Sequence, residues 1–106
     1  VVSIQDVDKE EIDVLINCSP VGMSPNLEET PVPSRCLRKG MIVFDSVYNP
    51  IETRLIREAR VSGCVTISGV ELFVNQAVGQ FELWTGQKAP TDIMRDVVVR
   101  GLEGKV

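Results

Sequence analysis

The chain has 106 residues, of which 43% are apolar, and a net charge of −4 from 11 basic and 15 acidic side chains. This length and composition fit one small globular domain and exclude a disordered tail, so we expect a single domain over residues 1–106. No apolar stretch approaches the roughly 20 residues of a membrane span. The acidic balance argues against a surface for nucleic acid, so we expect neither a membrane nor a nucleic acid as partner.

Histidine is absent, and the three cysteines, Cys18, Cys36 and Cys64, are far apart in the sequence. Without histidine, Ser-His-Asp and Cys-His catalysis within this chain is excluded. A zinc site needs more closely spaced ligands, so no metal site is expected. An odd, sparse set of cysteines is typical of a reducing compartment, which predicts a cytoplasmic location.

Short apolar runs in the first two thirds of the chain predict strands. They lie at residues 14–17, 41–44 and 64–67, and none alternates between apolar and polar residues, so we expect strands buried on both faces of a parallel sheet. Residues 1–5 are a candidate fourth strand. The proline-containing stretch 17–40 is too long for an idle turn and is expected to be a functional loop, with a turn of helix at residues 34–38.

Local signals in the second half of the chain predict helices. Asn49-Pro50 supplies a capping residue and a first-position proline, so a helix is expected from there to Gly63. Ser68 and Glu71 have the spacing of a capping box, which predicts a second helix that ends at Gly86. The expected apolar face of the first helix consists of Ile51, Leu55, Ile56 and Ala59.

Pro90 is expected to start a last helix, although residues 97–99 alone would also fit a strand. The expected apolar face of this helix consists of Ile93, Met94, Val97 and Val98. The alternation of strands and helices predicts an α/β domain with parallel strands and flanking helices, in three layers.

Polar clusters follow each predicted strand, at Asn17-Cys18-Ser19, at residues 45–48 and at Ser68-Gly69. Ligands of open α/β sheets bind beyond the carboxyl ends of the strands, so these clusters are candidate site residues. The alternative is that polar loop residues simply begin where strands end. Gln76 and Gln80 share a helical stripe with Leu72, where their amides would suit a neutral polyol or would only face solvent.

Three stretches of the chain resemble the C-terminal part of shikimate dehydrogenases: NCSPVGM at 17–23, FDSVYNPIETRLIREAR at 44–60 and SGVELFVNQAVGQFELWTG at 68–86. The resemblance implies the latter part of a Rossmann-like, NADP-binding domain with its closing helices. It also implies a parent enzyme that reduces 3-dehydroshikimate to shikimate with NADPH, in the shikimate pathway of aromatic amino-acid biosynthesis.

The same resemblance implies roles for individual residues. Tyr48 would contact the substrate carboxylate and Gln76 a substrate hydroxyl. The residues that would line the nicotinamide end of the cofactor are Ser19, Ser46, Gly69 and Leu72. The chain departs from the family at Ser68, Glu71 and Leu72, where many members have aspartate, glycine and methionine.

Other parts of the family pattern are missing from these residues. The glycine-rich dinucleotide turn, the basic residues for the 2′-phosphate and the catalytic lysine-aspartate pair would all precede residue 1. We therefore expect no catalytic residue in this chain, no activity of the 106 residues alone, and the missing N-terminal part as partner. Without that part, residues 14–16 would form an open strand edge that favours self-association.

Two alternatives remain open at this stage. The parent protein would instead be a quinate/shikimate dehydrogenase that uses NAD, or a non-catalytic binding module with the same fold.

Overall fold

The computed structural model describes residues 1–104 and is built around a parallel sheet of three strands. These are β1 (Val14–Asn17), β2 (Ile42–Asp45) and β3 (Val65–Ile67), in the order β1-β2-β3. The register places Asn17 opposite Asp45, so the carboxyl ends of β1 and β2 are level. The prediction of an α/β fold with parallel strands is confirmed.

Two short 3₁₀ helices lie in the first third of the chain. η1 spans Ile4–Lys9 and begins where the Ser3 hydroxyl accepts a hydrogen bond from the Gln5 amide, so the prediction of a strand at residues 1–5 is wrong. The serine side chain offers the backbone a local turn in place of a strand ladder. η2 spans Ser34–Cys36 and confirms the turn of helix predicted at 34–38.

Helix α1 (Arg54–Val61) crosses over between β2 and β3. It starts later than predicted, because Thr53 rather than Asn49 is the capping residue and accepts a hydrogen bond from the Ile56 amide at 3.3 Å. The end of the helix is as predicted: Gly63, just beyond it, has the positive φ of +83° that favours glycine.

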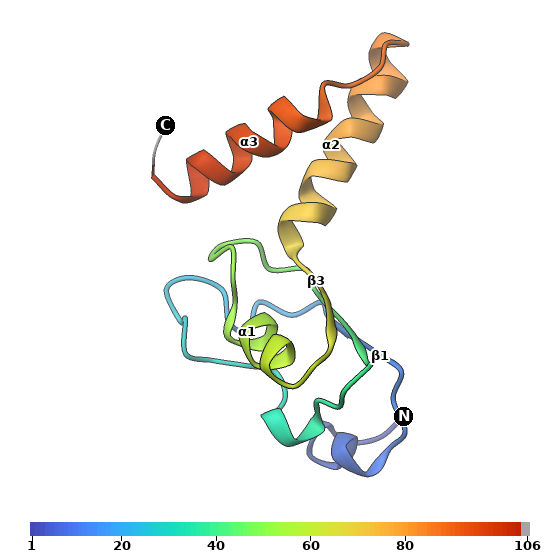
Figure 1. Cartoon of the computed structure of the whole chain (residues 1–106), viewed down its shortest axis with the longest axis vertical. Coiled ribbons are helices and arrows are strands. Elements are labelled where there is room, and N and C mark those ends of the chain that lie inside the picture. Colours follow the sequence, from blue (N-terminus) through green and yellow to red (C-terminus); the bar gives the residue numbers. More distant parts are fainter. Residues whose placement is uncertain (105–106) are drawn as a thin grey trace.

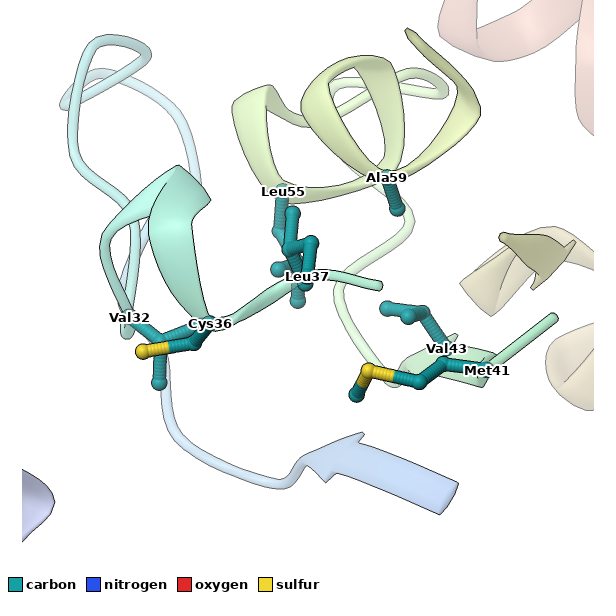
Figure 2. Close-up of a cluster of buried hydrophobic side chains, with 7 residues drawn as sticks. All are labelled: Val32, Cys36, Leu37, Met41, Val43, Leu55 and Ala59. Atoms are coloured by element: carbon teal, nitrogen blue, oxygen red, sulfur yellow. The ribbon is translucent and has the colours of Figure 1, made fainter. Parts of the chain in front are cut away.

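The core lies between α1, η2 and one face of the sheet. Leu55 and Ala59 point from α1 toward Val43 on β2 (Figure 2), and Val43 and Ala59 are fully buried. The other members of this cluster are Val32, Cys36, Leu37 and Met41. The apolar face predicted for the first helix is therefore confirmed at its buried positions.

The opposite face of the sheet is apolar but uncovered by residues 1–104. Val14, Ile42 and Val65 lie side by side across the three strands, and Val14 and Val65 are 49% and 57% exposed. Ile16 and Ile67 are exposed on the same face two residues further along. The prediction of strands buried on both faces is wrong for the described residues, since their helices cover only one face.

Helices α2 (Gly69–Thr85) and α3 (Thr91–Leu102) form a hairpin that extends away from the sheet (Figure 1). The predicted capping box at the start of α2 is wrong, because Ser68 makes no side-chain cap. The Glu71 carboxylate instead accepts two hydrogen bonds from the Arg95 guanidinium of α3, at 3.1 and 3.0 Å. These bonds raise the pKa of Arg95 above its usual value. The predicted end of α2 is confirmed by the left-handed Gly86.

Helix α3 starts just after Pro90, and residues 97–99 are helical rather than a strand. Its predicted apolar face is only partly correct. Met94 and Val98 are half-buried, whereas Ile93 and Val97 are exposed. The position of α2, rather than the apolar pattern of α3 alone, decides which side of α3 is covered.

We expect the buried face of α1 to dominate the stability of this chain. Leu55→Ala removes a side chain that is 1% exposed and should lower the free energy of unfolding by about 2–5 kcal/mol. Leu83→Ala, at a position that is 80% exposed, is the matched control and should change it by less than about 0.5 kcal/mol. Urea denaturation of the chain measures both values. Equal effects of the two substitutions would contradict this placement of the core.

Candidate functional site

An open pocket of about 460 Å³ lies between the loops after β1 and β2, at the carboxyl ends of the strands. Its lining consists of Cys18, Ser19, Pro20, Met23, Ser24, Ser46, Val47, Tyr48 and Asn49. Two of the polar clusters that the sequence placed at strand ends therefore meet in one site. The parallel register brings them together, because β1 and β2 end side by side.

Ser19 and Ser46 both line this pocket, and both hydroxyls are already used as donors within the chain. The Ser19 hydroxyl donates to the Asn17 side-chain oxygen at 2.6 Å, and the Ser46 hydroxyl donates to the Asn17 carbonyl at 2.8 Å. The Ser19 oxygen also accepts from the Val21 amide at 3.3 Å, so each hydroxyl oxygen keeps at least one lone pair for a further donor. The pocket thus offers acceptors for a ligand that carries N–H or O–H groups.

Tyr48 lies in the same pocket, at the start of the loop that leads to α1. Its ring packs against Phe73 of α2, with centroids 4.7 Å apart and planes tilted by 31°. The side chain is 39% exposed, and within residues 1–104 its hydroxyl makes no hydrogen bond. The ring is therefore held in place while the hydroxyl is available to a ligand.

Gly69 brings the first turn of α2 against the wall of this pocket. A Cβ atom at position 69 would clash with the Val47 carbonyl oxygen and would lie 2.7 Å from that of Ser46. Real Cβ atoms do not approach backbone so closely, so only glycine fits here. The sequence showed this glycine but not the backbone that it faces.

Leu72 and Gln76 do not line the pocket; both lie on the exposed side of α2. Gln76 is one turn beyond Phe73 and therefore further from the sheet along the helix. The structure thus brings Ser19, Ser46 and Tyr48 together and places Gly69 beside them. The two remaining predicted residues form a separate exposed stripe.

Three buried polar residues lie beneath the pocket: Asn17 and Asp45, which belong to the predicted clusters at the strand ends, and Thr53, which the sequence pattern did not indicate. The Asn17 amide donates to Asp45 at 3.1 Å, and the Thr53 hydroxyl donates to Asp45 at 2.7 Å. The available signal was a polar residue at the end of two adjacent apolar strands, which a parallel register would pair.

The three thiols differ in their surroundings. Burial raises the pKa of the Cys36 and Cys64 thiols, whereas Cys18 is exposed at the pocket. No three His, Cys, Asp or Glu side chains of residues 1–104 are grouped so that they could hold a metal ion. Within the same residues, no helix has the length and apolar character to cross a bilayer.

Comparison with known proteins relates this site to one family. Residues 69–99 match the model of the shikimate 5′-dehydrogenase C-terminal domain. The chain is 50% identical over 93 residues to the NADP(+) shikimate dehydrogenase of Methanosarcina mazei, covering 88% of this chain and 33% of that protein. The chain therefore spans about a third of the length of this relative.

Solved structures show the same relation. A shikimate dehydrogenase in complex with NADP+ superposes with a TM-score of 0.85 and 36% identity, over 92% of this chain and 34% of that one. Quinate dehydrogenase from Corynebacterium glutamicum, in complex with NAD, superposes with a TM-score of 0.81 and 36% identity, over 90% and 34%. The strands and flanking helices thus have the Rossmann-like arrangement of these enzymes.

The close approach at Gly69 predicts a strong effect of one added methyl group. Gly69→Ala should lower the free energy of unfolding by about 1–3 kcal/mol, because the helix must move away from the Val47 backbone. Gly79→Ala is the matched control: the added methyl group meets no atom within 4 Å, so the helix should gain about 0.5–1 kcal/mol. Thermal unfolding of both variants checks this. A Gly69→Ala protein as stable as the unsubstituted chain would contradict the observed packing.

Proposed function

The chain belongs to the shikimate dehydrogenase family and corresponds to its C-terminal third, and from this premise we propose its function. It forms one wall of an NADP-dependent site for the reduction of 3-dehydroshikimate. The observation that carries this proposal is the convergence of Ser19, Ser46 and Tyr48 in one pocket at the carboxyl ends of parallel strands. The reaction belongs to the shikimate pathway, which leads to aromatic amino acids.

In this proposal the pocket receives the nicotinamide end of the cofactor. The hydroxyl oxygens of Ser19 and Ser46 are acceptors that suit the N–H groups of a carboxamide, and Gly69 keeps α2 close beside them. Leu72 lies outside the pocket on the exposed stripe of α2, so its proposed contact with the ring requires the bound cofactor to extend beyond the pocket toward α2. When bound, NADPH supplies the hydride. No glycine-rich dinucleotide turn is present in the 106 residues, so the pyrophosphate would be held elsewhere.

Tyr48 and Gln76 are the proposed substrate contacts. The Tyr48 hydroxyl is aligned by the stacked ring of Phe73 and would donate a hydrogen bond to the substrate carboxylate. Gln76 is exposed on the same helix as Phe73, and its side-chain amide would bond a substrate hydroxyl.

The proposed partner of this chain is the N-terminal part of a shikimate dehydrogenase. The residues expected to perform catalysis belong to that part, so the chain alone should be inactive. The exposed sheet face and Trp84, which is 76% exposed on α2, are apolar surfaces that such a partner would cover. Without it, the outer edge of β1 favours self-association. The three unpaired cysteines support a reducing, cytoplasmic setting.

A second candidate is a quinate/shikimate dehydrogenase that uses NAD. The match to quinate dehydrogenase from Corynebacterium glutamicum supports this second candidate, because its TM-score is nearly the same as that of the shikimate enzyme. In both candidates the pocket would bind the nicotinamide end, which NAD and NADP share. The choice between NAD and NADP would therefore depend on groups outside these residues.

A chimera tests the proposal directly. This chain replaces the corresponding third of the Methanosarcina mazei enzyme, and reduction of NADP and of NAD is measured with shikimate and with quinate. We expect shikimate-dependent NADP reduction by the chimera and none by the 106-residue chain alone. A chimera that folds, by circular dichroism and cooperative unfolding, yet reduces neither cofactor would overturn the proposal. The chimera and its parent enzyme differ only in this third of the protein. Quinate oxidation by the chimera but not by its parent would therefore favour the second candidate.

Removal of the Tyr48 hydroxyl tests the substrate contact. In the chimera, Tyr48→Phe keeps the packing on Phe73 and removes only the donor, so kcat/KM for shikimate should fall by about 10- to 100-fold. The KM for NADP and the unfolding temperature serve as controls and should not change. If kcat/KM for shikimate stays within twofold of the unsubstituted chimera, Tyr48 is not the carboxylate donor.

A further inference from the structure

The pocket rests on a buried polar network that connects both of its loops to helix α1. Asn17, Asp45 and Thr53 are 4%, 0% and 1% exposed, and each comes from a different element or its border: the end of β1, the end of β2 and the cap of α1. All three lie on the covered face of the sheet, beneath the residues that line the pocket. Buried polar groups persist where they are hydrogen-bonded, which these are.

Asn17 fixes the loop after β1. Its side-chain NH₂ donates to the Asp45 carboxylate and to the Val21 carbonyl at 3.1 and 3.2 Å. Its side-chain oxygen accepts from the Ser19 amide at 3.1 Å and from the Ser19 hydroxyl at 2.6 Å. Acceptors thus lie on one side of the amide and donors on the other, so its neighbours permit only this orientation.

Asp45 fixes the loop after β2 and the start of α1. One carboxylate oxygen accepts from Asn17 and from the Val47 amide, the latter at 3.0 Å. The other oxygen accepts from the Thr53 hydroxyl, which in turn accepts from the Ile56 amide at the start of α1. The carboxylate is therefore satisfied by three donors rather than by a basic side chain, among residues 1–104.

We propose that the Asp45 carboxylate, clamped by Asn17 and Thr53, is a positioning residue that holds the Ser19 and Tyr48 loops in one fixed relation. This inference rests on the proposed function, because it assigns Asp45 a part in presenting those residues to the ligand. Asp45 itself does not line the pocket. It acts through Asn17 on the Ser19 loop and through the Val47 amide on the residue next to Tyr48.

The hydrogen-bond chemistry at position 45 makes the arrangement specific for a carboxylate. An isosteric amide at position 45 would turn one acceptor into a donor, and that donor would face Thr53, Asn17 or the Val47 amide. The Asn17 NH₂ and the Val47 N–H can only donate, and the Thr53 hydroxyl could accept only by turning its proton away from position 45, where it has its present acceptor. Either choice weakens the connection between the loops, and displacement of reacting groups by about 1 Å can cost about 100-fold in rate.

The test uses the chimera and two matched pairs of substitutions. Asp45→Asn is compared with Asp96→Asn, an exposed carboxylate on α3. Thr53→Val, which keeps the shape and removes the hydroxyl, is compared with Thr53→Ser, which retains it. Ala59→Gly weakens α1 without contact to the network and controls for lost stability. Steady-state kinetics are measured well below the unfolding temperature of every variant.

We expect kcat/KM for shikimate to fall about 10- to 100-fold in Asp45→Asn and at least about fivefold in Thr53→Val. Thr53→Ser, Asp96→Asn and Ala59→Gly should remain within about twofold. Hydrogen exchange, which does not depend on activity, should accelerate about tenfold or more at the Ser19 and Val47 amides in Asp45→Asn. The Phe44 amide within β2 should change much less.

The outcomes separate the two proposals. A folded but inactive unsubstituted chimera overturns the proposed function, while loop exchange still decides whether Asp45 fixes the loops. If exchange at Ser19 and Val47 rises no more than at Phe44, the positioning role is overturned. It is also overturned if Thr53→Val behaves kinetically like Ala59→Gly. Should Asp45→Asn fail to fold, the Thr53 pair carries the same comparison.

Discussion

The alignment of Asn17 with Asp45 across two parallel strands is the constraint on which the site depends. A parallel ladder leaves both strands ending at the same edge, so the loops that follow must begin side by side. The amide-carboxylate contact then joins the loops below the surface, and Thr53 extends the connection to the start of α1. A shift of β1 by one residue would place the Asn17 side chain on the opposite face and break this connection.

The position of α2 is set by two contacts of different kinds. At its first residue, Gly69 allows helix backbone to approach the backbone of the loop after β2. One turn further, the Tyr48 ring packs on Phe73. Between these two positions Glu71 bonds Arg95, which joins α3 to α2. The hairpin therefore keeps contact with the pocket although most of its length extends beyond the sheet (Figure 1).

The two faces of the sheet differ in what covers them. One face carries the core with α1, together with the polar network at its carboxyl end. The other face presents a regular array of Val14, Ile16, Ile42, Val65 and Ile67 that the described residues leave open. Parallel sheets are normally covered on both sides, so the open apolar face departs from the usual arrangement. Among the described residues, helix α1 covers one face only.

The sequence by itself determined the order of strands and helices, the buried positions of α1, the end of α2 at Gly86 and the location of polar clusters at strand ends. These features follow from local signals: uninterrupted apolar runs, helical spacing and a glycine that tolerates a left-handed backbone. Only the tertiary structure decided which of several local options was used. Glu71 bonds Arg95, distant in sequence, instead of capping its own helix, because a bidentate guanidinium offers a stronger partner than one amide. The pairing of Asn17 with Asp45 likewise depends on strand register, which joins residues 28 positions apart and has no local signal.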